Sequence, residues 1–167
     1  MIQQRPGDIL EIGFEGKWYY LVVVTKIVMF GGNIVYAFHG DGSRIEHFEP
    51  SPKKAGFNIC TDLLLPKKEG EVRRIGKVED ANEYLVLNLM KGCHEHRPGM
   101  KAREWWLYTI DPPQEFVKRV SRLSRTEELA MDRAMTSFDL AAQKIIARYS
   151  PEKNPFIERR RFLGLFS

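Results

Sequence analysis

The side chains with the clearest capacity for chemistry are Cys93, His94, Glu95 and His96. Thiolate and imidazole groups are preferred zinc ligands, and His47 or Cys60 could complete a tetrahedral set. Cys93 and His94 are adjacent, however, whereas zinc motifs pair ligands about two to four residues apart. Glycine and proline flank the segment, which is typical of a solvated loop. We therefore predict neither a metal centre nor a cofactor.

Nucleophilic catalysis is the other chemistry that these residues allow, with Cys93 or Cys60 beside any of the four histidines. Such a pair needs a third orienting group and an oxyanion hole, and no spacing in the sequence indicates them. No glycine-rich phosphate loop precedes a predicted helix, and the glutamates of residues 11–49 follow no acid–base spacing. The sequence therefore favours a binding protein over an enzyme.

Aromatic runs carry a clearer signal, because neighbouring residues of a strand point to opposite faces of the sheet. Residues 18–20 are Trp-Tyr-Tyr and residues 105–106 are Trp-Trp, so each run should place one ring in the core and another near solvent. Exposed rings beside arginines can anchor a protein interface or stack on bases, and simple packing is the alternative. We predict a partner-binding surface made of Trp18, Tyr20, Arg73, Arg74 and Trp106.

Composition indicates a globular chain: 167 residues, 43% apolar and 29% charged. No apolar run approaches the roughly 18–20 residues that cross a bilayer, and no stretch of signal-peptide length begins the sequence. We expect a cytoplasmic protein without membrane contact. Its two cysteines are too few for a disulfide framework.

Charge is distributed unevenly along the chain. Residues 1–111 carry 15 basic and 15 acidic residues, so the net charge of +4 falls in residues 112–167. Its densest part is Arg159, Arg160 and Arg161. Acidic residues alternate with the other basic residues of this segment, which is typical of a solvated helix surface.

Residues 1–111 show the pattern of a β domain. Turn residues separate segments rich in β-branched and aromatic residues, which predict strands over 9–14, 18–28, 34–39, 45–48, 57–65, 72–78, 84–90 and 105–110. The first three should form an antiparallel meander with short turns. Residues 57–65 fit one helical turn equally well. Strands of this length and spacing favour a strongly bent, SH3-like barrel or sheet.

Residues 112–167 show a helical pattern instead. A short helix is predicted over 114–123, and Ser124 with Glu127 fits a capping box before a helix over 126–149. The apolar stripe of that helix is Met131, Met135, Phe138, Ala142, Ile145 and Tyr149. This stripe could cover the sheet or form a homodimer. The predicted fold is therefore α+β, with an antiparallel β domain over 1–111 and a C-terminal helical appendage with a basic tail over 112–167.

Three N-terminal segments follow one another in an informative order: Pro6-Gly7-Asp8-Ile9-Leu10-Glu11-Ile12, Gly16-Lys17-Trp18-Tyr19-Tyr20 and Val35-Tyr36-Ala37-Phe38. A Gly-Asp-Ile strand, a turn through glycine and an aromatic-rich return strand resemble the opening of the bacterial immunity proteins grouped as immunity protein family twenty-six. The pair Ile75-Gly76 is similar to a later strand of that family. The resemblance implies a non-enzymatic cytoplasmic protein that binds a cognate toxin and occludes its active site or substrate groove, with no functional residues to carry over.

Two functions stay open at this point. The first is a protein-binding inhibitor, of a toxin or of another enzyme such as one of a host cell. The second is a nucleic-acid-binding module that uses exposed aromatics and the basic C-terminal tail. The neutral charge balance of residues 1–111 favours the first, and the arginines of the tail favour the second. Binding to phosphates would weaken steeply with salt, which separates the two.

Overall fold

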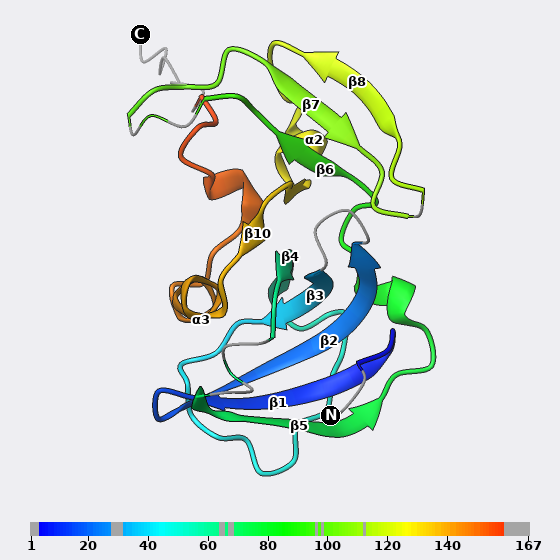
Figure 1. Ribbon diagram of the computed structural model, residues 1–167, viewed down its shortest axis with the longest axis vertical. Helices are drawn as coiled ribbons and strands as arrows, with labels where there is room; N and C mark the ends of the chain where they lie inside the picture. Colours follow the sequence, from blue (N-terminus) through cyan, green and yellow to red (C-terminus); the bar gives the residue numbers. More distant parts are fainter. Residues whose placement is uncertain are drawn as a thin grey trace, which may run out of the picture.

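The computed structural model describes residues 4–27, 32–63, 66, 69–95, 97, 99–111 and 113–158. In this part of the chain two β-sheets dominate, and Figure 1 shows them at opposite ends of the molecule. The remaining regular elements are short: η1 (Ala81–Tyr84), α2 (Arg125–Glu128), α3 (Phe138–Ile146) and η2 (Pro151–Lys153). None of the helices in these residues has the length and apolar character that crossing a bilayer requires.

The larger sheet has six strands in the spatial order β10-β4-β3-β2-β1-β5. They are β1 (Asp8–Phe14), β2 (Lys17–Ile27), β3 (Gly32–Phe38), β4 (Gly56–Thr61), β5 (Glu71–Lys77) and β10 (Met135–Thr136). The predicted antiparallel meander of the first three strands is confirmed. Glu15 and Gly16 make the tight turn between β1 and β2 with φ values of 50° and 73°, as a two-residue hairpin loop requires.

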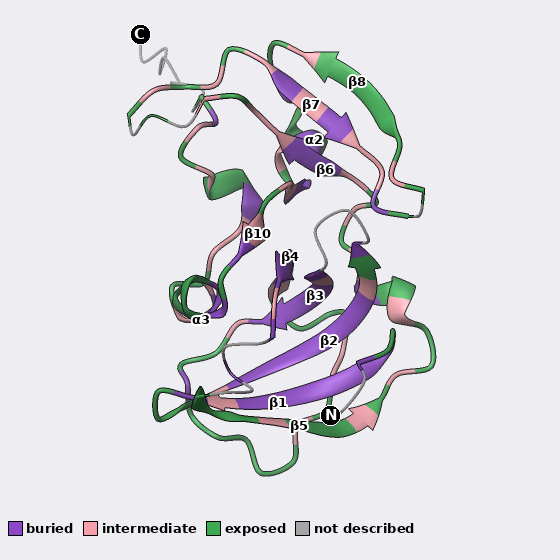
Figure 2. Ribbon diagram, viewed as in Figure 1, coloured by how far each residue is buried: buried purple, intermediate pink, exposed green. Residues whose placement is uncertain are grey.

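Both faces of the larger sheet are covered, so its central strands are buried almost throughout, as Figure 2 shows in purple. On one face, α3 inserts Phe138, whose ring meets those of Phe14 and Tyr19 edge-on at centroid distances of 5.5 and 5.7 Å. On the other face, the loop of residues 39–55 and η1 pack over the rings of Tyr20 and Phe38. Burial on both sides explains why these strands are apolar without interruption.

The smaller sheet has four strands in the order β8-β7-β6-β9. They are β6 (Met90–Gly92), β7 (Trp105–Tyr108), β8 (Phe116–Val120) and β9 (Met131–Asp132). Trp105 and Leu107 of β7 point into a small core of their own. β8 is an edge strand, and nearly all of it is exposed, as its green ribbon in Figure 2 shows.

The prediction of an SH3-like barrel followed by a helical segment is wrong. The larger sheet is open, because it ends in β10 and β5, which do not pair with each other. Within residues 114–123 the chain forms the strand β8 (Phe116–Val120) instead of a helix, and its branched Val120 lies opposite Trp105. Residues 45–48 lie in a loop, and the strand predicted over 84–90 begins only at Met90.

The long helix predicted over 126–149 is also wrong. Its N-terminal capping box is confirmed, since Ser124 and Glu127 exchange side-chain and backbone hydrogen bonds, but α2 ends after one turn. The backbone then pairs with the smaller sheet, where Met131 N donates to Leu89 O at 3.1 Å and Arg133 N donates to Lys91 O at 2.8 Å. Pairing with two preformed sheets outweighs the modest local preference for a helix.

Candidate functional site

A long loop, residues 39–55, joins β3 to β4. Loops of more than about 12–15 residues without regular structure are uncommon and are usually functional or disordered. This loop is tied down at three points: Trp18 N donates to Gly42 O at 2.9 Å, His39 N donates to Ala55 O at 3.0 Å, and the Tyr36 hydroxyl donates to Lys54 O at 2.6 Å. These hydrogen bonds hold the loop in an ordered conformation against one face of the larger sheet.

Glu11 of β1 holds the middle of this loop. Its buried carboxylate accepts hydrogen bonds from Arg44 Nε at 3.2 Å and Arg44 Nη2 at 3.0 Å. The same guanidinium lies over the Trp18 ring, 4.2 Å from its centroid. The Tyr20 hydroxyl accepts from Ile45 N at 2.6 Å and donates to Ile45 O at 3.1 Å, while burial raises its pKa. Trp18 and Tyr20 thus contact the chain's own loop.

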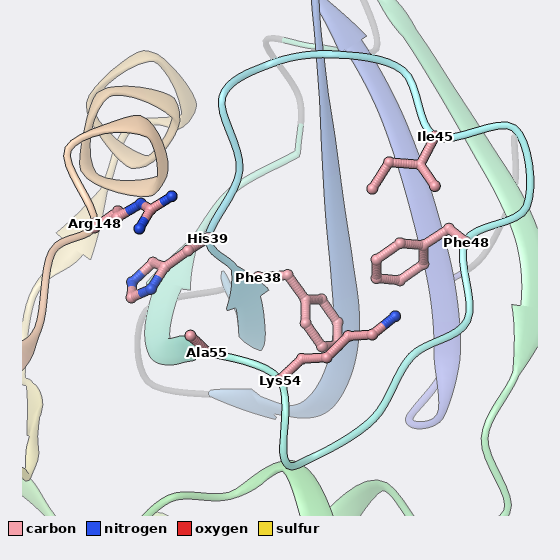
Figure 3. A pocket seen from close by; sticks show the side chains of 7 residues that line it. All are labelled: Phe38, His39, Ile45, Phe48, Lys54, Ala55 and Arg148. Carbon is pink, nitrogen blue, oxygen red and sulfur yellow. The ribbon is translucent and has the colours of Figure 1, made fainter.

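A pocket of about 350 Å³ lies between this loop and the C-terminal end of α3 (Figure 3). Pockets of about 300–1,000 Å³ are the size that small ligands occupy. Its lining consists of Phe38, His39, Ile45, Phe48, Lys54, Ala55 and Arg148. His39 Nε2 lies 2.8 Å from the carbonyl oxygen of Tyr149 and must donate to it, which orients the ring. We call this the loop pocket.

A second candidate site lies on the smaller sheet. Trp106 and Tyr108 alternate with the buried residues of β7 and share one face with Phe116 and Arg119 of β8. The rings of Tyr108 and Phe116 meet at 5.6 Å, and the guanidinium of Arg133 lies 4.2 Å from the Tyr108 centroid. We call these five residues the aromatic strip. It begins beside the core, where Tyr108 packs, and reaches solvent at Phe116, which is 58% exposed.

Glu104 positions the outer part of the strip. Its carboxylate accepts a hydrogen bond from Trp106 Nε1 at 2.7 Å and forms an ion pair with Arg119 Nε at 3.3 Å. The His94 ring stands edge-on to the Trp106 ring at 3.9 Å. These contacts restrict the rotamers of Trp106 and Arg119 before any partner arrives, which lowers the entropy that binding would cost.

The five predicted partner-binding residues do not form one surface. Pairing registers place Arg73 in one row with Glu11 and Tyr20, and Arg74 one residue further, on the opposite face of the larger sheet. Both arginines are exposed on the edge strand β5, where Arg73 pairs with Glu71 and Arg74 lies 3.7 Å from Asp8. Trp106 belongs to the other sheet. The partner-binding role of these residues stays a prediction.

The cysteine–histidine cluster is divided among different contacts. His94 packs on Trp106, and the thiol of Cys93 lies 3.5 Å from the carbonyl oxygen of Glu95. Burial raises the pKa of that thiol. Among the described residues no three His, Cys, Asp or Glu side chains are arranged to hold a metal ion. His96 and the arginines of residues 159–161 lie outside the described residues.

Sequence reasoning missed a buried lysine at the centre of a polar network. The ammonium of Lys91 donates to the carbonyl oxygens of Glu128, Ala130 and Pro151 at 2.7, 2.6 and 3.0 Å. It lies 3.5 Å from Asp132, whose carboxylate also accepts from Tyr149 at 2.6 Å and Asn154 at 2.8 Å. Burial lowers the pKa of Lys91 to about 8, and Asp132 opposes that shift. No local sequence pattern predicts these contacts, because the partners of Lys91 lie far from it in the sequence.

The loop pocket was missed as well. Its polar lining residues lie far apart in the sequence, at positions 39, 54 and 148, and the apolar stripe of residues 131–149 predicts a helix instead of a pocket. The length of the 39–55 loop was the one available signal.

Comparison with known proteins adds no relative. No protein-family model matches the chain, and neither the curated proteins nor the solved structures include a match.

Proposed function

We propose that the chain is a non-enzymatic inhibitor that binds another protein through the aromatic strip and blocks it. The observation that carries this proposal is the strip itself. Trp, Tyr and Arg dominate the binding energy of protein interfaces, and here they share one face that ends at an exposed edge strand. A cognate toxin is the partner that we propose, on the resemblance of the first 40 residues to immunity proteins.

The aromatic strip is suited to be the central, energetically dominant part of a larger protein–protein interface. A stable complex buries about 800 Å² on each partner, of which a few central residues supply most of the energy. Trp106 and Arg119 are held by Glu104, and Phe116 and Val117 offer apolar surface beside them. The bound chain would inhibit its partner if this face covers the partner's active site or blocks the path by which substrate enters it.

Co-purification tests the proposal. The tagged full-length chain is expressed with its genomic neighbours and isolated in about 0.5 M salt, where most phosphate-driven binding is lost. We expect one stoichiometric protein partner that arrests growth when it is expressed alone and is harmless in the presence of this chain. Nucleic acid that co-purifies only in low salt, without a protein partner, would contradict the proposal and favour the nucleic-acid-binding alternative.

Substitutions locate the interface. Trp106→Ala and Phe116→Ser should each weaken the complex at least tenfold, because central interface residues contribute 2 kcal/mol or more, on the order of a thirtyfold change in Kd. Leu140→Ser is the matched control, since Leu140 is 45% exposed on α3, away from the strip. Reversing the charges of Arg73 and Arg74 tests the predicted contribution of β5, and unchanged affinity would remove both arginines from the interface.

A further inference from the structure

We propose that the loop pocket binds a small organic anion, in which one carboxylate or phosphate group is joined to an aromatic or aliphatic body. This site is separate from the aromatic strip and does not depend on the protein-binding proposal. Figure 3 shows its side chains coming from three segments, the end of β3, the 39–55 loop and the turn that follows α3, and surrounding a common opening.

The charge of the pocket selects an anion. The cationic side chains of Lys54 and Arg148 line it, and none of its described lining residues is acidic. Lys54 Nζ lies 5.0 Å from the centroid of Phe48 and donates to Glu49 O. Arg148 is exposed, and its guanidinium forms no hydrogen bond or ion pair with the residues that the structure describes. Hydrogen bonds with Ser43 lower the pKa of the Asp41 carboxyl, and the charge of Arg148 contributes to that shift, so Asp41 lies within electrostatic reach of the guanidinium. An incoming anion can therefore bind Lys54 and Arg148 without breaking an ion pair among the described residues, although it competes with the longer-range attraction between Arg148 and Asp41.

The apolar part of the lining selects the body of the ligand. The rings of Phe38 and Phe48 pack edge-on at 5.0 Å, and Ile45 beside them is 46% exposed. Ligand pockets typically combine apolar walls of this kind with a few polar groups that fix orientation. Inorganic phosphate would make no contact with the apolar walls, and a neutral aromatic molecule would form no ion pair with Lys54 or Arg148.

The backbone at Arg148 is an independent sign of a special position. Arg148 has a φ of 50°, where a residue with a Cβ is strained and glycine is the usual choice after a helix. The turn is held by hydrogen bonds from Arg148 N to Ile145 O at 3.2 Å and from Tyr149 N to Lys144 O at 2.9 Å. Strained backbone of this kind occurs preferentially at functional sites. Here it places a long cationic side chain at the mouth of the pocket.

The test is a titration of the full-length, isotope-labelled protein, followed through its amide resonances, with phenyl phosphate, benzoate, inorganic phosphate and benzyl alcohol. We expect saturable shifts at His39, Ala55 and Arg148 with phenyl phosphate or benzoate, and at least tenfold weaker binding of the other two probes. Whichever of phenyl phosphate and benzoate binds with the lower Kd identifies the preferred head group, phosphate or carboxylate. Equal binding of inorganic phosphate or benzyl alcohol, or no saturable shift at the pocket, would overturn the proposal.

Arg148→Gly separates binding from folding. The substitution removes the guanidinium and places glycine where φ is positive, so Tm should stay the same or rise while the affinity for the probe falls at least tenfold. Lys54→Gln should weaken binding too, whereas Lys53→Gln, an exposed neighbour outside the lining, should not. Unchanged affinity in Arg148→Gly would overturn the assignment. Partner capture through the strip is measured separately, so either proposal can fail alone.

Discussion

Glu11 and Lys91 are both buried charges that tie distant segments together, but they are compensated in different ways. The charge of Glu11 is compensated by one guanidinium, that of Arg44, whose side chain is 48% exposed at the rim of the larger sheet. Lys91 has a fully buried side chain, whose ammonium donates hydrogen bonds to three backbone carbonyls and forms an ion pair with Asp132. Water can therefore replace the partner of Glu11 far more easily than the partners of Lys91. The first network holds a loop, and the second holds the C-terminal segment on the smaller sheet.

Lys91→Met should have the largest effect on stability. It leaves the three carbonyls without their donor and Asp132 without its cation, and removing one partner of a buried pair costs about 3–5 kcal/mol. Urea denaturation of the variant measures the free energy of unfolding. Lys77→Met, at an exposed position of β5, is the control and should change it little. A loss below about 1 kcal/mol in Lys91→Met would show that the network is not a structural anchor.

Glu11→Gln should cost less, about 1–2 kcal/mol, because Arg44 can turn to water when the charged hydrogen bonds weaken. Its effect should be local: amide hydrogen exchange should accelerate over residues 40–48 and stay unchanged in β6 and β7. Glu15→Gln, at an exposed turn position, is the matched control. Faster exchange throughout the molecule in Glu11→Gln would contradict the division into two networks.

The pKa of Lys91 predicts how stability depends on pH. A lysine whose pKa is about 8 in the folded protein and 10.5 when unfolded binds more protons in the unfolded state between those values. Stability therefore rises with pH, by on the order of 1 kcal/mol between pH 8 and 9 from this group. Above pH 9, Cys60 opposes the rise, because burial raises its pKa to about 11. The Lys91 ε-carbon resonance should titrate near pH 8, and a midpoint near 10.5 would exclude the effect.

The smallest expected effect is on thiol reactivity. Cys60 is buried on β4 beside β10, with its sulfur 3.9 Å from that of Met135. Release of β10 should therefore expose it. Asp132→Asn, which weakens the second network, should speed the labelling of Cys60 by a thiol reagent at pH 8 several-fold, whereas Glu11→Gln should not. Equal labelling rates in the two variants would show that the networks open together.

The sequence predicts local features of this fold well. The β1–β2–β3 meander follows from alternation and tight turns between neighbouring strands, and the capping box at Ser124 follows from two residues of one turn. Alternation also distinguishes buried Trp105 from half-buried Trp106. Each of these features depends on residues only a few positions apart.

Contacts between distant residues account for the rest. Tyr20 lies on the face that was expected to be exposed, but Arg44 is 33 residues from Glu11 and brings a loop over it. The apolar stripe of residues 131–149 satisfies helical spacing, yet Met131 packs in one core cluster and Phe138 in another, on opposite sides of the larger sheet. Two short strands that carry Met131 and Met135, followed by the short helix α3, together reproduce the spacing of one long helix face. The basic tail at residues 159–161 lies outside the described residues.

The two parallel pairings of the C-terminal segment also set the order in which this molecule can assemble. β9 completes the smaller sheet beside β6, and β10 completes the larger one beside β4, across a separation of 75 residues. The meander can form early from local contacts, while closure of both sheets waits for residues 131–136 to be synthesised. Until then β4 and β6 present unpaired edges, which invite pairing between chains. Aggregation during biosynthesis should therefore depend on how quickly this short segment reaches both sheets.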